Sequence, residues 1–169
     1  MLAAIREAFP ERPLPNVTLR QAQLADQSLS REITDEEWSA EGEKDRSTAW
    51  TEIDDTTLED CDAAMAHIDE EGFVYYLPAF ISLAVRQLQS GNYNNSKCFS
   101  GTVFHLTFIS ENYALARLKR LTDRQIELII EFLRLVRDRS KFDAADAERA
   151  LKSYWETPEA HRRTLIYVP

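Results

Sequence analysis

Residues 121–139 read LTDRQIELIIEFLRLVRDR, and this stretch decides the fold class. Thr122 followed three residues later by Gln125 forms a capping box, which is typical of a helix start. Apolar side chains then recur three and four residues apart, the spacing of one helix face. A second apolar row widens that face and leaves only a narrow polar stripe. We therefore expect this helix to lie in the centre of the core.

Similar signals occur along the first half of the chain. Thr34 with Glu37 has the spacing of a second capping box. Thr56 begins a third such signal, and the apolar stripe after it predicts a helix that ends at Gly72 in a left-handed cap. Pro78 suits the first position of a new helix, because a missing amide costs nothing there.

The segment around residues 103–109 shows a different pattern. Phe104, Leu106 and Phe108 alternate with polar neighbours, and such alternation favours a short strand. Residues 165–168 are its candidate partner in a two-stranded β element. Apart from this element, the sequence predicts a mainly α fold.

Length and composition indicate a single domain over residues 1–169. The chain is 44% hydrophobic and 29% charged, which is typical of a folded globular protein. No internal repeat and no Gly/Ser-rich linker divides it. We expect one compact helical domain.

The negative charge is concentrated in the first part of the chain. The net charge is -9, but residues 1–72 hold 19 acidic and 6 basic side chains, whereas residues 73–169 hold 10 acidic and 14 basic ones. Nucleic acids and anionic membranes need clustered Lys and Arg, so neither is an expected partner. A basic protein is the partner that this charge favours.

The sequence also indicates a cytoplasmic protein. Charges interrupt the first nine residues, which argues against a secretory signal. The uncharged run of residues 73–85 is too short to cross a bilayer, and Pro78 interrupts it. Cys61 and Cys98 form no CxxC pair, so we interpret them as buried, reduced thiols.

No signature of a known enzyme class is recognisable. The four glycines cannot form a dinucleotide-binding loop, a P-loop or a hydrolase elbow. Neither His nor Cys is spaced for a closed metal site, and no cofactor is expected. We therefore favour a non-catalytic protein that binds another protein, with the toxin-neutralising immunity proteins as one concrete form of this hypothesis.

Two sets of residues are candidates for function. The first is an acidic interaction surface that comprises Asp35, Glu36, Glu37, Asp54, Asp55, Glu59, Asp60 and Asp62. The second is a pocket of a small enzyme or ligand-binding domain, comprising His67, Tyr75, Tyr76 and Arg86, in which aromatic hydroxyls and a guanidinium would orient an anion. The carboxylates near His67 have two possible roles: they could hold a cation together with the imidazole, or they could cap a helix. We favour helix capping.

Five stretches of the chain together resemble an uncharacterised bacterial family of unknown function. They are residues 4–9, 50–53, 71–80, 121–125 and 150–155. The most specific is Tyr-Tyr-Leu-Pro-Ala-Phe at residues 75–80. The resemblance implies a shared fold and a small soluble protein, and it brings no catalytic or ligand residues with it.

Overall fold

Helices account for all regular structure in the part of the chain that the structure describes. The computed structural model covers residues 1–45, 49–107 and 112–162, and no strand occurs among them. The predicted mainly α fold is confirmed. In chain order the elements are α1 (Leu2–Ala8), α2 (Leu19–Gln27), α3 (Asp35–Asp45), η1 (Trp50–Glu52), α4 (Asp55–Asp60), α5 (Ala64–His67), α6 (Glu70–Ser90), η2 (Asn92–Asn95), α7 (Lys97–Thr107), α8 (Asn112–Lys119), α9 (Asp123–Arg139), α10 (Ala144–Ala150), η3 (Leu151–Trp155) and α11 (Pro158–Arg162).

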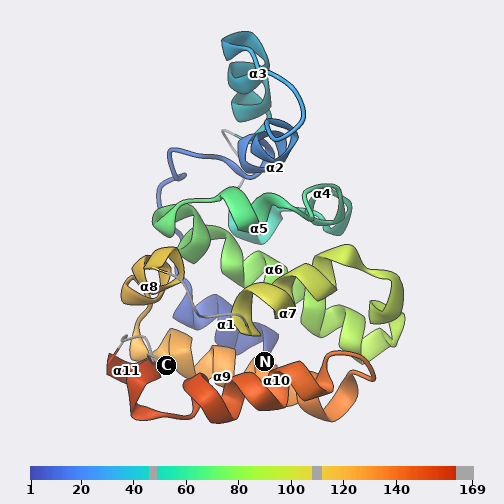
Figure 1. Cartoon of the computed structure of the whole chain (residues 1–169), viewed down its shortest axis with the longest axis vertical. Helices are drawn as coiled ribbons and strands as arrows, with labels where there is room; N and C mark the ends of the chain where they lie inside the picture. The colour runs from blue at the N-terminus through green and yellow to red at the C-terminus, as the bar shows by residue number, and fades with distance from the viewer. Residues whose placement is uncertain (46–48, 108–111, 163–169) are drawn as a thin grey trace.

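The helices form layers around one apolar core. In Figure 1, α9 and α10 lie at the base, α6 and α7 above them, and α2 and α3 at the opposite end. A continuous cluster of buried side chains extends from Ile5 in α1 to Ala160 in α11. No helix of the described residues is long and apolar enough to span a bilayer.

Helix α6 is the central element of this core. Every residue from Gly72 to Val85 is buried, so the helix is packed on all sides. The sequence predicted a helix end at Gly72 and a new start at Pro78, and both predictions are wrong. The helix begins instead at Glu70, and Asp69 caps it with a carboxylate that accepts a hydrogen bond of 2.7 Å from the amide of Gly72. Pro78 removes one helical hydrogen bond in the interior, and surrounding packing offsets that loss.

The segment before α6 forms two short helices, α4 and α5, where the sequence predicted one helix. Asp54, and not Thr56, caps α4 by accepting a hydrogen bond of 2.8 Å from the amide of Thr57. A turn at Cys61–Ala63 then separates α4 from α5. The amide of Ala63 in this turn donates to the side chain of Gln23 on α2 at 2.9 Å, which fixes the break.

Helix α9 has the start and the apolar face that its sequence predicts. The prediction that it is the central helix is wrong, because α9 lies at the base of the fold (Figure 1) and α6 is the helix buried on all sides. Thr122 and Gln125 form the predicted capping box, with both reciprocal hydrogen bonds present. The side-chain amide of Gln125 also donates to the carbonyl of Ala8 at 2.9 Å, which ties the helix start to the end of α1. Both apolar rows are buried, since α9 packs against α10 as well as α1.

The prediction of a strand near residues 103–109 is wrong for the residues that the structure describes. Residues 103–107 belong to helix α7, while residues 108–109 and 165–168 lie outside the described ranges. Phe99, Val103 and Leu106 are among the buried residues of α7, and their spacing of four and three is helical. Phe104, which suggested alternation, is 51% exposed.

Helices α2 and α3 project from the body of the molecule, as Figure 1 shows. The predicted capping box of Thr34 and Glu37 is confirmed, with hydrogen bonds of 3.0 and 3.2 Å at the start of α3. Only Gly42 and Asp45 of α3 are buried. The helix therefore presents most of its surface to solvent.

Candidate functional site

The residues of the predicted pocket do not line one common pocket among those of the described residues. Tyr75 and Tyr76 are both buried, with ring centroids 4.8 Å apart in an edge-on arrangement. Tyr75 lines a pocket near the loop of residues 12–15, whereas Tyr76 lines another at the start of α2. The Tyr76 hydroxyl accepts a hydrogen bond of 3.1 Å from the amide of Leu19. Burial raises the pKa of Tyr76, so its role is that of a neutral structural group.

The two basic members of that set each lie against a carboxylate. The ring Nε2 of His67 lies 3.0 Å from the carboxylate of Asp26 on α2. Arg86 pairs with Asp55 and lines a third pocket. The four side chains thus do not meet in one cleft among the described residues. The two tyrosines are buried, and the two basic side chains lie against carboxylates.

The carboxylates of the predicted interaction surface fall into two groups. Those on and near α4, with the exception of Asp60, have partners within the molecule. Asp54 caps the helix, Glu59 accepts a hydrogen bond of 2.7 Å from Ser96, and Asp62 lies 3.9 Å from Lys97. Asp55 pairs with Arg86, so of this group Asp60 is the one that makes no hydrogen bond or ion pair among the described residues.

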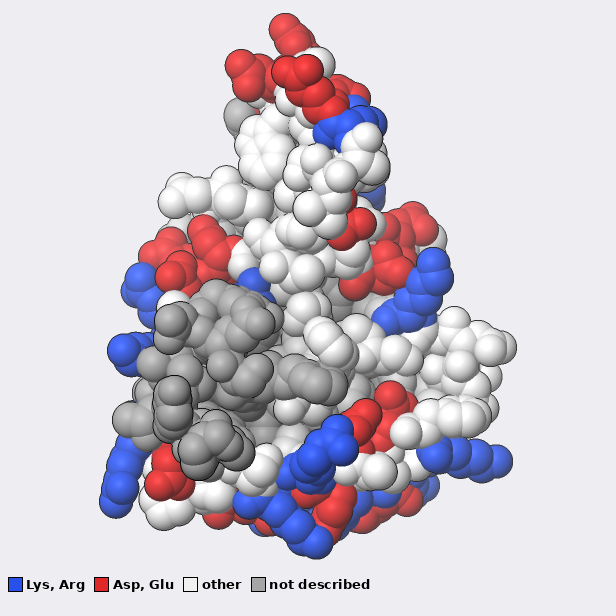
Figure 2. Space-filling model, viewed as in Figure 1, with Lys and Arg blue, Asp and Glu red and all other residues white. Residues whose placement is uncertain are grey.

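The second group lies on the projecting helix α3. Glu37 closes the capping box and forms an ion pair with Arg31 at 2.9 Å. The hydrogen bond from Arg31 lowers the pKa of the Glu37 carboxyl. Asp35 and Glu36 are exposed and make no hydrogen bond or ion pair within the described part of the chain. Figure 2 shows red side chains gathered at the tip of the projection, with further acidic groups on the two flanks below it.

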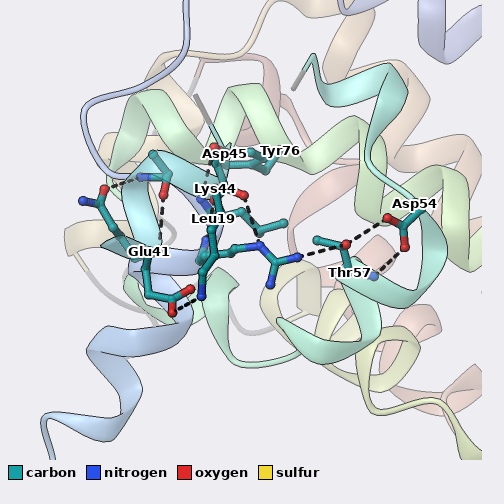
Figure 3. Close-up of polar contacts among 10 residues, drawn as sticks. Leu19, Glu41, Lys44, Asp45, Asp54, Thr57 and Tyr76 are labelled. Atoms are coloured by element: carbon teal, nitrogen blue, oxygen red, sulfur yellow. Dashed lines mark hydrogen bonds and ion pairs between the residues drawn. The ribbon is translucent and has the colours of Figure 1, made fainter. Parts of the chain in front are cut away.

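The junction of α2 with α3 is a polar network that the sequence did not reveal (Figure 3). Asp45, at the last position of α3, is 7% exposed. Its carboxylate accepts a hydrogen bond of 2.8 Å from the amide of Arg20 and lies 3.4 Å from the guanidinium of the same residue. That guanidinium also donates to the hydroxyl of Thr57 at 3.2 Å. A pocket of about 230 Å³ opens beside this network.

A second contact brings the two helices close together. Trp38, Gly42 and Asp45 share one side of α3, since they are four and three residues apart. A Cβ atom on Gly42 would lie 2.6 Å from the side-chain nitrogen of Gln21, so any larger residue there would displace the Gln21 side chain. The same nitrogen donates to the carbonyl of Trp38 at 3.0 Å. Helix α3 is thereby held in one orientation on α2.

Two buried thiols and one partly buried histidine have pKa values that favour their neutral forms. Burial raises the pKa of Cys61 and of Cys98 to about 12, so both thiols remain protonated and unreactive near neutral pH. Burial, assisted by the charges of Arg117 and His67, lowers the pKa of His105 to about 4. Among the described residues, no three His, Cys, Asp or Glu side chains lie together as metal ligands do. The feature that stands out is therefore the fixed acidic projection.

Comparison with known proteins gives a family without an assigned activity. The model of a family of unknown function, DUF6714, matches residues 1–159. No curated protein and no solved structure matches the chain.

Proposed function

The chain belongs to this family of unknown function, DUF6714, and membership brings no activity with it. From the geometry we propose that the protein is a non-catalytic, cytoplasmic binding protein. In this proposal its helix α3 docks onto a basic protein partner. Its binding surface is the α3 face, which we define as the exposed outward side of that helix with the carboxylates of Asp35, Glu36 and Glu43. The projection of this acidic helix from the body is the observation that carries the proposal.

The charge of α3 supports a basic partner. The helix contains six carboxylates and one lysine, and that lysine pairs with Glu41 inside the helix. Acidic side chains concentrated on a protruding element attract a basic surface and accelerate its encounter. Asp35 and Glu36 of α3 make no hydrogen bond or ion pair among the described residues, whereas capping, hydrogen bonds and ion pairs engage every predicted carboxylate on and near α4 except Asp60.

The exposure of α3 is the second support. A helix that serves only the fold normally buries an apolar stripe, yet α3 buries just a glycine and an aspartate. Its contacts serve to orient it, through Gln21 and through Arg20. A preorganised surface loses less conformational entropy when a partner binds.

The cysteines support a location in the cytoplasm. Cys61 and Cys98 are each 1% exposed and carry free thiols. Structural thiols without disulfides are common in reducing compartments.

Affinity capture with matched variants tests the proposal. The α3-neutral variant combines Asp35→Asn, Glu36→Gln and Glu43→Gln, which keep side-chain size and remove charge. The base control combines Glu127→Gln, Glu131→Gln and Asp146→Asn, which remove the same charge from α9 and α10. We expect wild type and the base control to retain the same basic protein from native lysate, and the α3-neutral variant to lose it. Equal retention by all three, or the recovery of an acidic partner alone, would contradict the proposal.

A further inference from the structure

A pocket distinct from the α3 face lies between α1, η1, α4 and α6. Its volume is about 390 Å³, near the lower end of the roughly 300–1,000 Å³ of small-molecule sites. Leu2, Trp50, Leu58 and Ala79 give it an apolar lining. Leu58, Trp50 and Ala79 are at most 5% exposed, so packing holds this lining in place.

The polar groups of the pocket are cationic. Arg6 from α1 and Arg86 from α6 both line it, and no carboxylate does. Arg6 is exposed and has no ion pair among the described residues, whereas Arg86 is paired with Asp55 outside the lining. The two guanidinium groups and Asp55 together leave one positive charge, in a protein whose net charge is -9. That local charge complements a single negative charge.

Ser82 adds a donor to the same wall. Ala79, Ser82 and Arg86 follow one side of α6 at spacings of three and four, so all three face the pocket. Ser82 is 9% exposed, and its hydroxyl makes no hydrogen bond within the described residues. This donor is therefore available to a molecule in the pocket. A ligand oxygen would supply its partner.

From this arrangement we propose that the pocket binds a small monocarboxylate with an apolar body. The apolar part lies against Trp50 and Leu58, and the carboxylate accepts hydrogen bonds from Arg6 and Arg86, with Ser82 as a third donor. Arginine suits this role because its planar group matches a carboxylate with two parallel hydrogen bonds. The site is independent of the α3 face and of any partner bound there.

Calorimetric titration with octanoate tests this inference on the full chain. Octanol, which lacks the charge, and acetate, which lacks the apolar body, are the ligand controls. Octanoate should bind, and both controls should bind at least on the order of tenfold more weakly, because each lacks one half of the recognition. Arg6→Gln should weaken octanoate binding on the order of tenfold, while Arg139→Gln, an exposed arginine outside the lining, should leave it unchanged.

A second variant fills the pocket instead of altering its charge. Ala79→Leu adds volume to the apolar wall and should abolish octanoate binding while the helical circular dichroism spectrum is retained. Three results would each overturn the inference: no octanoate binding to the wild type at millimolar concentration, octanol binding as tight as octanoate binding, or unchanged affinity in Arg6→Gln. Arg6 is exposed, so its replacement leaves the fold intact and the result interpretable.

Discussion

The carboxylate of Asp45 accepts a hydrogen bond of 2.8 Å from the backbone amide of Arg20, 25 residues earlier in the chain. Arg20 is in the first turn of α2, where helix amides have no partner inside the helix. The neighbouring amides are satisfied in the same way, Leu19 by the hydroxyl of Tyr76 and Gln21 by that of Thr18. The last residue of α3 therefore completes the start of α2, and this link sets the direction of the projection.

Removal of this link should loosen α3. In Asp45→Ala the Arg20 amide and guanidinium lose a buried acceptor, so we expect the free energy of unfolding to fall by about 1 to 3 kcal/mol. Urea denaturation measures the loss, and amide hydrogen exchange should show faster exchange in α3 than in α9. Asp35→Asn, at an exposed position of the same helix, is the control and should change stability by less than about 0.5 kcal/mol. An Asp45→Ala variant as stable as this control would show that the link is unimportant.

The local features of the fold were predictable from sequence, whereas the long-range ones were not. The capping boxes at Thr34 and Thr122 were identified correctly, because both partners lie within four residues. Pro78 was misplaced because a helix buried on all sides tolerates a proline that a solvated helix does not. Residues 103–107 of α7 were wrongly predicted as part of a strand, because the exposed Phe104 imitates an alternating pattern.

The candidate site was predictable only in part for the same reason. The acidic character of residues 35–37 is plain in the sequence, but their position on a projection depends on how α3 packs against α2. The Asp45 network joins segments far apart in the chain, so no spacing rule reveals it. Tyr75, Tyr76 and Arg86 were expected to converge, yet successive positions of one helix face different directions, and each residue lines a different pocket.

Core truncations should separate the buried stripes from the exposed apolar residues. Phe80 is 1% exposed and Ile130 is 8% exposed, so replacement of either by Ala should cost about 2 to 5 kcal/mol of unfolding free energy. Leu29 is 81% exposed, and Leu29→Ala should cost less than about 0.5 kcal/mol. Urea melts of the three variants make this comparison. Wild-type stability in Phe80→Ala and Ile130→Ala would refute the assignment of the core.

The two thiols should be inert in the native protein. Each is 1% exposed and has a pKa raised to about 12 by burial, so little thiolate forms at pH 8. Reaction with Ellman's reagent should be slow in buffer and should reach two thiols per chain in guanidinium. The melting temperature should be the same with and without reductant. Rapid native labelling would contradict the buried placement.

Stability should fall between pH 6.5 and pH 4 because of His105. Its pKa in the folded state is about 4, below its ordinary value of 6.5, so the unfolded chain binds the proton first as the pH decreases. The stability contributed by the neutral ring is complete above about pH 6.5 and is lost progressively down to about pH 4. The difference in unfolding free energy between wild type and His105→Asn should follow this window, since the other titrating groups cancel. A difference that is independent of pH would show that His105 is not desolvated.

The association rate of the captured partner across a salt series tests the central claim most directly. Charges more than about 8 Å apart are largely screened at physiological ionic strength, so steering by the α3 face should weaken as salt rises. In stopped-flow mixing the association rate of the wild type should fall steeply as salt rises, and the base control should behave as the wild type does. The α3-neutral variant should associate more slowly at low salt, and its rate should be nearly independent of the salt concentration. The three rates should converge at high salt. A wild-type rate that is insensitive to salt and equal to that of the α3-neutral variant would contradict docking through α3.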